Sequence, residues 1–214
     1  MIAAAQLREE VAQRVVLQLG VVPAQIDELP RELAIEQDVR EQIRFVVEGE
    51  GVWTVVSGDA IRMSRGDFLP QSAWNWHAHH NAAQAPMAWI DGLDIPFSQQ
   101  MDVGFFEFGA ERVTDYATPN FSRGERLWCH PGVRPLSGLQ DTVASPIGAY
   151  RWAFTDRALT EQLLLEDEGY PATVAPGHAA IRYVNPTTGG DVMPTIRCEF
   201  HRLRDGTETA ARRD

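Results

Sequence analysis

Apolar and polar residues alternate along residues 43–97, in segments such as IRFVVEGEGVWTVV and APMAWIDGLDIPF. This period of two is typical of β-strands that bury one face. The stretch is divided at short intervals by Gly49, Gly51, Gly58 and Gly66. Glycines at such intervals favour tight turns between antiparallel strands. The pattern therefore predicts an all-β unit, with a jelly-roll barrel as the expected architecture.

The residues before this stretch follow a helical pattern instead. Apolar side chains recur at helical spacing at Leu7, Val11 and Val15. They predict an amphipathic helix over residues 1–19 that ends at Gly20. Residues 21–30 carry two prolines and predict a loop. Residues 31–42, RELAIEQDVREQ, are mostly strong helix formers, so propensity predicts a second helix there.

The second half of the chain mixes irregular, helical and strand-like segments. Residues 102–146 are rich in Gly, Pro and Ser and predict irregular structure. The segment TDRALTEQLLLEDEG predicts a helix with Thr155 as its N-cap. The apolar face of that helix is expected to carry Leu159, Leu163 and Leu164. From Pro176 to Leu203 the pattern is rich in strands again, and the final residues are polar.

Composition narrows the classes of function. The 214 residues carry a formal net charge of −11 and a pI near 5.0, which argues against nucleic acids and anionic membranes as partners. No stretch approaches the roughly 20 apolar residues of a membrane span, and early charges in the first residues argue against a secretory signal. The two cysteines, Cys129 and Cys198, have no metal-binding spacing, so a reduced, cytoplasmic setting is expected.

The densest group of metal-binding side chains lies in WNWHAHHN. On a strand, His77 and His79 would point to one face and His80 to the other. Neutral imidazole is a common ligand of iron and zinc. The spacing alone favours the interpretation that they are ordinary polar strand residues near the rim of a barrel. His130 and His178 lie beside Pro and Gly, and we expect them to be turn and packing residues.

Longer motifs resemble one known family. They are IRFVVEGEGVWTVV, RGDFL, WNWHAHHN, WIDGLDIPF, ERLWCHPGVRPL, YRWAFTDRAL and NPTTGGDVMPTIR. Together they resemble the gentisate 1,2-dioxygenases, iron-dependent ring-cleaving enzymes of the cupin class with two jelly-roll barrels in one chain. The spacing of Gly66, His77 and Asn81 also meets the general second motif of cupins.

The resemblance implies an all-β fold made of a cupin jelly-roll barrel, a helical connector and a partial second cupin. The expected boundaries are a divergent helical segment at 1–42, the barrel core at 43–100, a connector with a helix at 101–175 and the partial second cupin at 176–214. Bare strand edges on a partial barrel favour association, so pairing with another subunit in a homo-oligomer is an alternative to packing on the first barrel.

The resemblance also implies a site. In the family three histidines hold Fe(II), which brings dioxygen and a small hydroxylated aromatic acid together for ring opening. His77 corresponds to one metal ligand, and His79 to a group that hydrogen-bonds the substrate or oxygen. Arg44 corresponds to the partner of the substrate carboxylate. Asp91 is expected to fix a histidine from outside the coordination shell. Trp74, Trp76 and Trp89 are candidates to line the substrate pocket, although large aromatic side chains are first of all core residues.

One departure from the family pattern bears on the metal. The family carries a His-x-His pair eight and six residues before the arginine, where this chain has Glu36 and Asp38. In one hypothesis both acids join His77 in a substitute site, since carboxylates and imidazole bind Fe(II) together elsewhere. In the other, which the helix propensity of residues 31–42 favours, both lie on a solvated helical face.

Two functions remain open at this stage. The first is a gentisate 1,2-dioxygenase, or a relative that acts on salicylate, hydroxynaphthoate or another aromatic acid. The second is an inactive cupin that binds an aromatic acid without metal. Because only His77 remains of the three family ligands, we expect Fe(II) to bind weakly or not at all.

Overall fold

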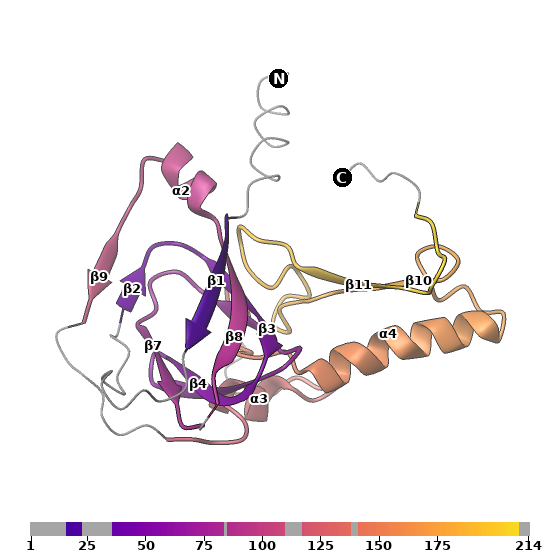
Figure 1. Ribbon diagram of the computed structural model, residues 1–214, viewed down its shortest axis with the longest axis horizontal. Coiled ribbons are helices and arrows are strands. Elements are labelled where there is room, and N and C mark those ends of the chain that lie inside the picture. The colour runs from indigo at the N-terminus through magenta and orange to yellow at the C-terminus, as the bar shows by residue number, and fades with distance from the viewer. Residues whose placement is uncertain (1–15, 23–35, 84, 110–116, 138–140, 210–214) are drawn as a thin grey trace.

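The computed structural model describes residues 16–22, 36–83, 85–109, 117–137 and 141–209, and Figure 1 shows the arrangement of its elements. A group of strands forms a barrel, and a long helix with a two-stranded hairpin lies beside it. The strands are β1 (Val16–Val22), β2 (Glu36–Asp38), β3 (Gln42–Glu48), β4 (Glu50–Val56), β5 (Asp59–Ser64), β6 (Phe68–Gln71), β7 (His77–Asn81), β8 (Met87–Leu93), β9 (Phe106–Phe108), β10 (His178–Arg182) and β11 (Glu199–Leu203). The helices are α2 (Ile95–Gln100), α3 (Arg123–Trp128) and α4 (Trp152–Asp167). None of the helices in the described ranges is long and apolar enough to cross a membrane.

Two antiparallel sheets build the barrel. The strand order is β1-β8-β3-β6 in one sheet and β5-β4-β7-β2-β9 in the other. One buried core joins the two sheets, with Val46, Leu69, Met87 and Trp89 from the first and Val52, Ile61 and Met63 from the second. The all-β barrel expected from the alternation of residues 43–97 is therefore confirmed, with only α2 departing from strand at its end.

The turn between β4 and β5 shows how glycine sets the register of the barrel. Ser57 and Gly58 both have positive φ, at 47° and 77°. Two such residues in a row are typical of a type I′ turn, whose twist matches that of the strands it joins. The turn brings Val56 opposite Asp59, and the pairing continues from there along both strands.

The first expected helix is wrong where the structure describes it. Residues 16–19 belong to strand β1, which pairs along its whole length with β8, and Gly20 lies inside this strand opposite Trp89. Residues 1–15 of the expected helix lie outside the described residues. Helix propensities differ by at most about 0.7 kcal/mol per ordinary residue, so a complete ladder with β8 outweighs them.

The second expected helix is also wrong over its described part. Residues 36–38 form β2, which pairs with β7 on one side and β9 on the other. Residues 39–40 form a bend before β3 begins at Gln42. Because β2 has neighbours on both sides, its backbone groups are satisfied by a sheet that local helix propensity cannot anticipate.

Helix α4 begins earlier than its expected cap. Arg151 occupies the N-cap position, and Thr155 lies in the first turn, where its hydroxyl is 3.0 Å from that of Tyr183. The backbone N–H of Trp152 donates to Asp67 of the barrel, so a tertiary contact fixes the start of the helix. Leu159 is fully buried as expected, whereas Leu164 is 49% exposed.

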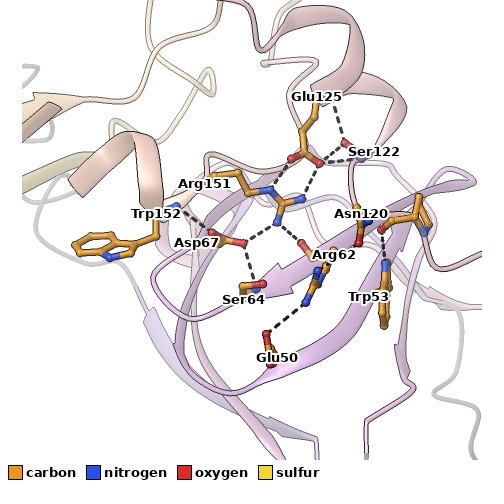
Figure 2. Close-up of polar contacts among 11 residues, drawn as sticks. Glu50, Trp53, Arg62, Ser64, Asp67, Asn120, Ser122, Glu125, Arg151 and Trp152 are labelled. Atoms are coloured by element: carbon orange, nitrogen blue, oxygen red, sulfur yellow. Dashed lines mark hydrogen bonds and ion pairs between the residues drawn. The ribbon is translucent and has the colours of Figure 1, made fainter. Parts of the chain in front are cut away.

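A buried network anchors this helix to the barrel (Figure 2). The guanidinium of Arg151 donates two hydrogen bonds to Glu125, at 2.5 and 2.8 Å, and one to Asp67 at 2.6 Å. Glu125 also closes a capping box with Ser122 at the start of α3. Burial disfavours the charged guanidinium, but the two carboxylates more than offset it, so the pKa of Arg151 is raised. The network joins the barrel, α3 and α4 through one side chain.

The hairpin β10–β11 packs on the outside of the barrel. Phe68 of β6 stacks on Tyr183 just beyond β10, with ring centroids 4.3 Å apart. A second apolar cluster around this pair contains Val192, Met193, Ile196 and Cys198. The strand-rich pattern expected beyond Pro176 is thus confirmed, while β9 and α3 interrupt the stretch that was expected to be irregular.

A buried acid lies where the bend enters β3. Glu41 is 8% exposed, and its backbone N–H donates to Asp94, which also accepts a 2.6 Å hydrogen bond from Thr195. Burial raises the pKa of Glu41 to about 7, a hydrogen bond from the backbone of Ala73 opposes the shift, and the charge of Asp94 adds to it.

Replacing Glu41 by glutamine should stabilise the protein at neutral and alkaline pH. In the unfolded chain Glu41 ionises near its ordinary pKa of 4.5, while in the folded chain it holds its proton up to about 7. The stability that the protein keeps while Glu41 is protonated, relative to its ionised form, is therefore fully present below pH 4.5. It is lost as the pH rises through 7. We expect Glu41→Gln to gain on the order of 1 kcal/mol above pH 7, after allowing for solvent screening, and nothing at pH 4. Urea unfolding at both pH values measures this, with exposed Glu48→Gln as the control; an equal gain at both pH values would contradict it.

Candidate functional site

The interior of the barrel gathers polar side chains from four strands. Arg44 on β3 and Asp91 on β8 are paired in register, and both are buried. His79 on β7 lies opposite Thr54 on β4 in the facing sheet. Because side chains alternate along each strand, these positions project from the two sheets into the same interior. His77, two residues before His79, lies on the same side of β7.

Arg44 and Asp91 form a buried, bidentate ion pair in this interior. The guanidinium donates from Nε to Oδ1 at 2.7 Å and from Nη2 to Oδ2 at 3.2 Å. Trp89 donates its indole N–H to Asp91 at 3.0 Å, and its ring lies 5.2 Å from the Arg44 guanidinium carbon. Such a bidentate pair fixes the plane of the guanidinium. Asp91 therefore orients Arg44, and its described partners include no histidine, contrary to the expectation that it fixes one.

Thr54 links the arginine to the histidine strand. Its hydroxyl is 3.4 Å from Nη1 of Arg44 and 3.5 Å from the carbonyl oxygen of Ala78, which lies between His77 and His79. Thr54 is 2% exposed. These long contacts are weak individually, but they place one hydroxyl between the guanidinium and the strand that carries both imidazoles.

The two inward histidines lie beside this group. His77 is 3% exposed, and its ring centroid is 6.0 Å from that of His79. The ring of His79 lies 5.1 Å from that of Trp89, and its Nδ1 is buried without a hydrogen-bond partner among the described residues. Burial, and then the charges of Arg44 and His77, lower the pKa of His79 well below its ordinary value. His79 is therefore neutral at physiological pH and offers a lone pair.

Other expected site residues lie elsewhere. Trp74 is 55% exposed and stacks on Phe105 with ring centroids 5.3 Å apart, so it does not join the interior group. Trp89 is the tryptophan that does. His80 lies opposite Trp53, outside the set of interior pairs, as alternation along β7 predicts.

The two acids in place of the family histidines lie on a strand and not on a helix. The backbone of Glu36 is paired opposite His77, whereas the carboxylate of Asp38 is held by Arg40, with Nε to Oδ1 at 2.6 Å. Within the described ranges, no group of three or more His, Cys, Asp or Glu side chains is placed to hold a metal ion. The described side chains therefore do not supply three protein ligands for iron.

The sequence pattern missed Thr54, and it did not indicate that Trp89 contacts Asp91 and Arg44. Both depend on register: Thr54 lies opposite His79 only because β4 and β7 pair as they do, and Trp89 shares a face with Asp91. The spacing of two between Trp89 and Asp91 could have indicated a shared face on a strand.

Comparisons with known proteins agree with this fold. The Cupin domain model matches residues 33–95. A gentisate 1,2-dioxygenase from Streptomyces sp is 55% identical over 182 residues, which cover 85% of this chain and 51% of that protein. The chain thus spans about half the length of this relative.

Solved structures of related dioxygenases are also similar to this chain. The salicylate 1,2-dioxygenase from Pseudaminobacter salicylatoxidans is 72% identical, with a TM-score of 0.83, and the match covers 90% of this chain and 53% of that one. The structure of that dioxygenase as an adduct with gentisate is 73% identical with a TM-score of 0.83, and covers 90% of this chain and 51% of the other.

Proposed function

We propose that this chain, which is a member by homology of the gentisate 1,2-dioxygenase family of cupin proteins, acts as a gentisate dioxygenase-like cupin that receives a hydroxylated aromatic acid in its barrel. The Pseudaminobacter relative has been obtained as an adduct with gentisate, and its named substrate is salicylate. Both acids carry a carboxylate beside a ring hydroxyl, so the proposed substrate class is the 2-hydroxybenzoates. The proposal has two versions: ring cleavage by dioxygen in the first, and binding of the aromatic acid without turnover in the second.

The observation that carries this proposal is the buried guanidinium of Arg44. A guanidinium has five N–H donors, and Asp91 and Thr54 engage only part of them. A carboxylate that enters the barrel would find a planar cation already oriented, beside the ring of Trp89 and the neutral ring of His79. Pre-orientation lowers the entropy lost on binding.

The metal requirement separates two versions of the proposal. Fe(II), where a family member binds it, activates dioxygen and aligns it with the substrate. His77 would hold such an ion here, and Glu36 is the further candidate because its backbone lies opposite. The engagement of Asp38 by Arg40 favours the second version, a cupin that binds an aromatic acid without turnover.

Selective binding of a carboxylated ring tests the proposal. We expect gentisate to bind at least tenfold more tightly than hydroquinone, its analogue without the carboxylate, because one charge-assisted contact contributes about 1.5–3 kcal/mol. Calorimetry with both ligands measures the difference. Arg44→Met should abolish it, whereas replacing exposed Arg65 in the same way should not. Equal affinities of the unmodified protein for the two ligands would refute the role of Arg44.

Oxygen uptake then distinguishes the two versions. After addition of Fe(II), a dioxygenase consumes one dioxygen per gentisate opened, and Glu36→Ala should remove this activity together with bound iron. Selective gentisate binding without uptake would identify the non-catalytic version.

A further inference from the structure

The hairpin β10–β11 carries a group of histidines away from the barrel interior. Arg202 of β11 donates to Asp156 and Thr160 of α4, so this face of the hairpin packs on the helix. Side chains alternate along a strand, so Glu199 and His201 project from the opposite face. Figure 1 shows α4 along one side of the hairpin only.

Two imidazole nitrogens meet on that opposite face. Nε2 of His178 is 2.8 Å from Nδ1 of His201, across the two strands. Nε2 of His201 is 3.1 Å from a carboxylate oxygen of Glu199, whose other oxygen is 2.7 Å from Arg197. His178 is 9% exposed, so little of its ring reaches solvent.

We propose that His178 and His201 form a binding site for one divalent transition-metal ion, with zinc as the preferred probe, separate from the barrel interior. The proposal does not depend on the function proposed for the barrel. It rests on two converging ring nitrogens and on a carboxylate placed behind one of them.

Glu199 prepares His201 for this role. By accepting from Nε2–H, the carboxylate selects the tautomer in which Nδ1 carries the lone pair, and this lone pair points at His178. Histidine ligands almost always donate their other ring N–H to a carboxylate, carbonyl or water in this way. Arg197 in turn holds Glu199 in place. On metal binding, His178 takes the Nδ1–H tautomer in place of the Nε2–H tautomer, so that Nε2 can face the ion.

The geometry needs only a small adjustment. Zinc–nitrogen bonds of about 2.0–2.1 Å in a tetrahedron require the two nitrogens to be roughly 3.3 Å apart, so the present 2.8 Å must open slightly. The side chain of His201 is 36% exposed and can make this movement. Water would fill the remaining positions. By the usual order of affinities, copper and nickel should also bind, and Fe(II) more weakly than either.

Zinc titration of the metal-free full chain tests the site. We expect calorimetry to show one site per chain in the unmodified protein and at least tenfold weaker binding in His178→Ala and His201→Ala. Glu199→Ala should weaken binding by about 10–100-fold, the range usual for such outer partners. His201 is exposed enough for its replacement to leave the fold intact, which circular dichroism checks. Imidazole NMR signals of His178 and His201 should shift with added zinc.

Two controls locate the ion. His130→Ala removes an exposed histidine that contacts the carbonyl of Arg126, and His77→Ala removes the barrel histidine; both should keep the zinc affinity. Absence of zinc binding at millimolar concentration would show that the two rings form a hydrogen bond only. Binding that is lost in His77→Ala and kept in His201→Ala would place the ion in the barrel. Either result overturns the proposal.

Discussion

Arg151→Met should lower the free energy of unfolding by about 3–5 kcal/mol, the usual result when one partner of a buried ion pair is removed. Asp67 and Glu125 are 2% and 3% exposed, and Arg151 is the cation that faces both. Methionine fills much of the arginine volume, so the loss arises mainly from two carboxylates left without their countercharge. Urea unfolding followed by circular dichroism measures it.

The chain offers a matched control for this experiment. Arg157 lies on the same helix, is 80% exposed in its side chain and reaches Glu161 only at 3.9 Å. Such surface pairs contribute at most about 0.5 kcal/mol, so Arg157→Met should leave stability nearly unchanged. A loss below about 1 kcal/mol in Arg151→Met would mean that the network in Figure 2 is not what joins α4 to the barrel.

Asp91→Asn should destabilise the protein by a similar 3–5 kcal/mol and should make its stability respond more strongly to aromatic acids. The substitution leaves Arg44 buried, with a side chain 3% exposed, and without its carboxylate partner. A carboxylate ligand in the barrel would supply the missing charge. Gentisate should therefore raise the melting temperature of Asp91→Asn by more than it raises that of the unmodified protein.

Hydroquinone and a surface variant complete this test. Hydroquinone lacks the carboxylate and should give the variant no added stability. Glu50→Gln removes the acid of a surface pair with Arg62, at 3.3 Å, in which the Glu50 side chain is 74% exposed. This control should change the stability by no more than about 0.5 kcal/mol and should leave the gentisate response unchanged. If gentisate stabilises Asp91→Asn no more than hydroquinone does, Arg44 does not receive the carboxylate.

The alternation of apolar and polar residues predicted the barrel, because this pattern reports directly which side chains are buried. The alternation of residues 43–97 follows from one face of each strand packing on the common core, so the all-β prediction needed no knowledge of strand order. The same period of two predicted that His77 and His79 lie on one face of their strand. The helix around Leu159 was likewise visible in its apolar spacing, although its start was not.

Tertiary structure decided what depended on partners distant in the sequence. Residues 16–19 and 36–38 carry helix-forming composition, yet they become strands because β8, β7 and β9 supply backbone partners that no local window contains. Asp67 replaces Thr155 at the start of α4 for the same reason.

The candidate site also has features that the sequence determined and features that only the tertiary structure decided. The sequence by itself determined which residue types are present: Arg44, His77, His79 and Asp91 at strand spacing, and two acids where the family has histidines. Only the tertiary structure decided that Asp91 holds Arg44 and not a histidine, and that Asp38 is held by Arg40. Both are contacts between side chains, the first on paired strands and the second across a bend. Their energies depend on register and burial, which the linear sequence pattern does not encode.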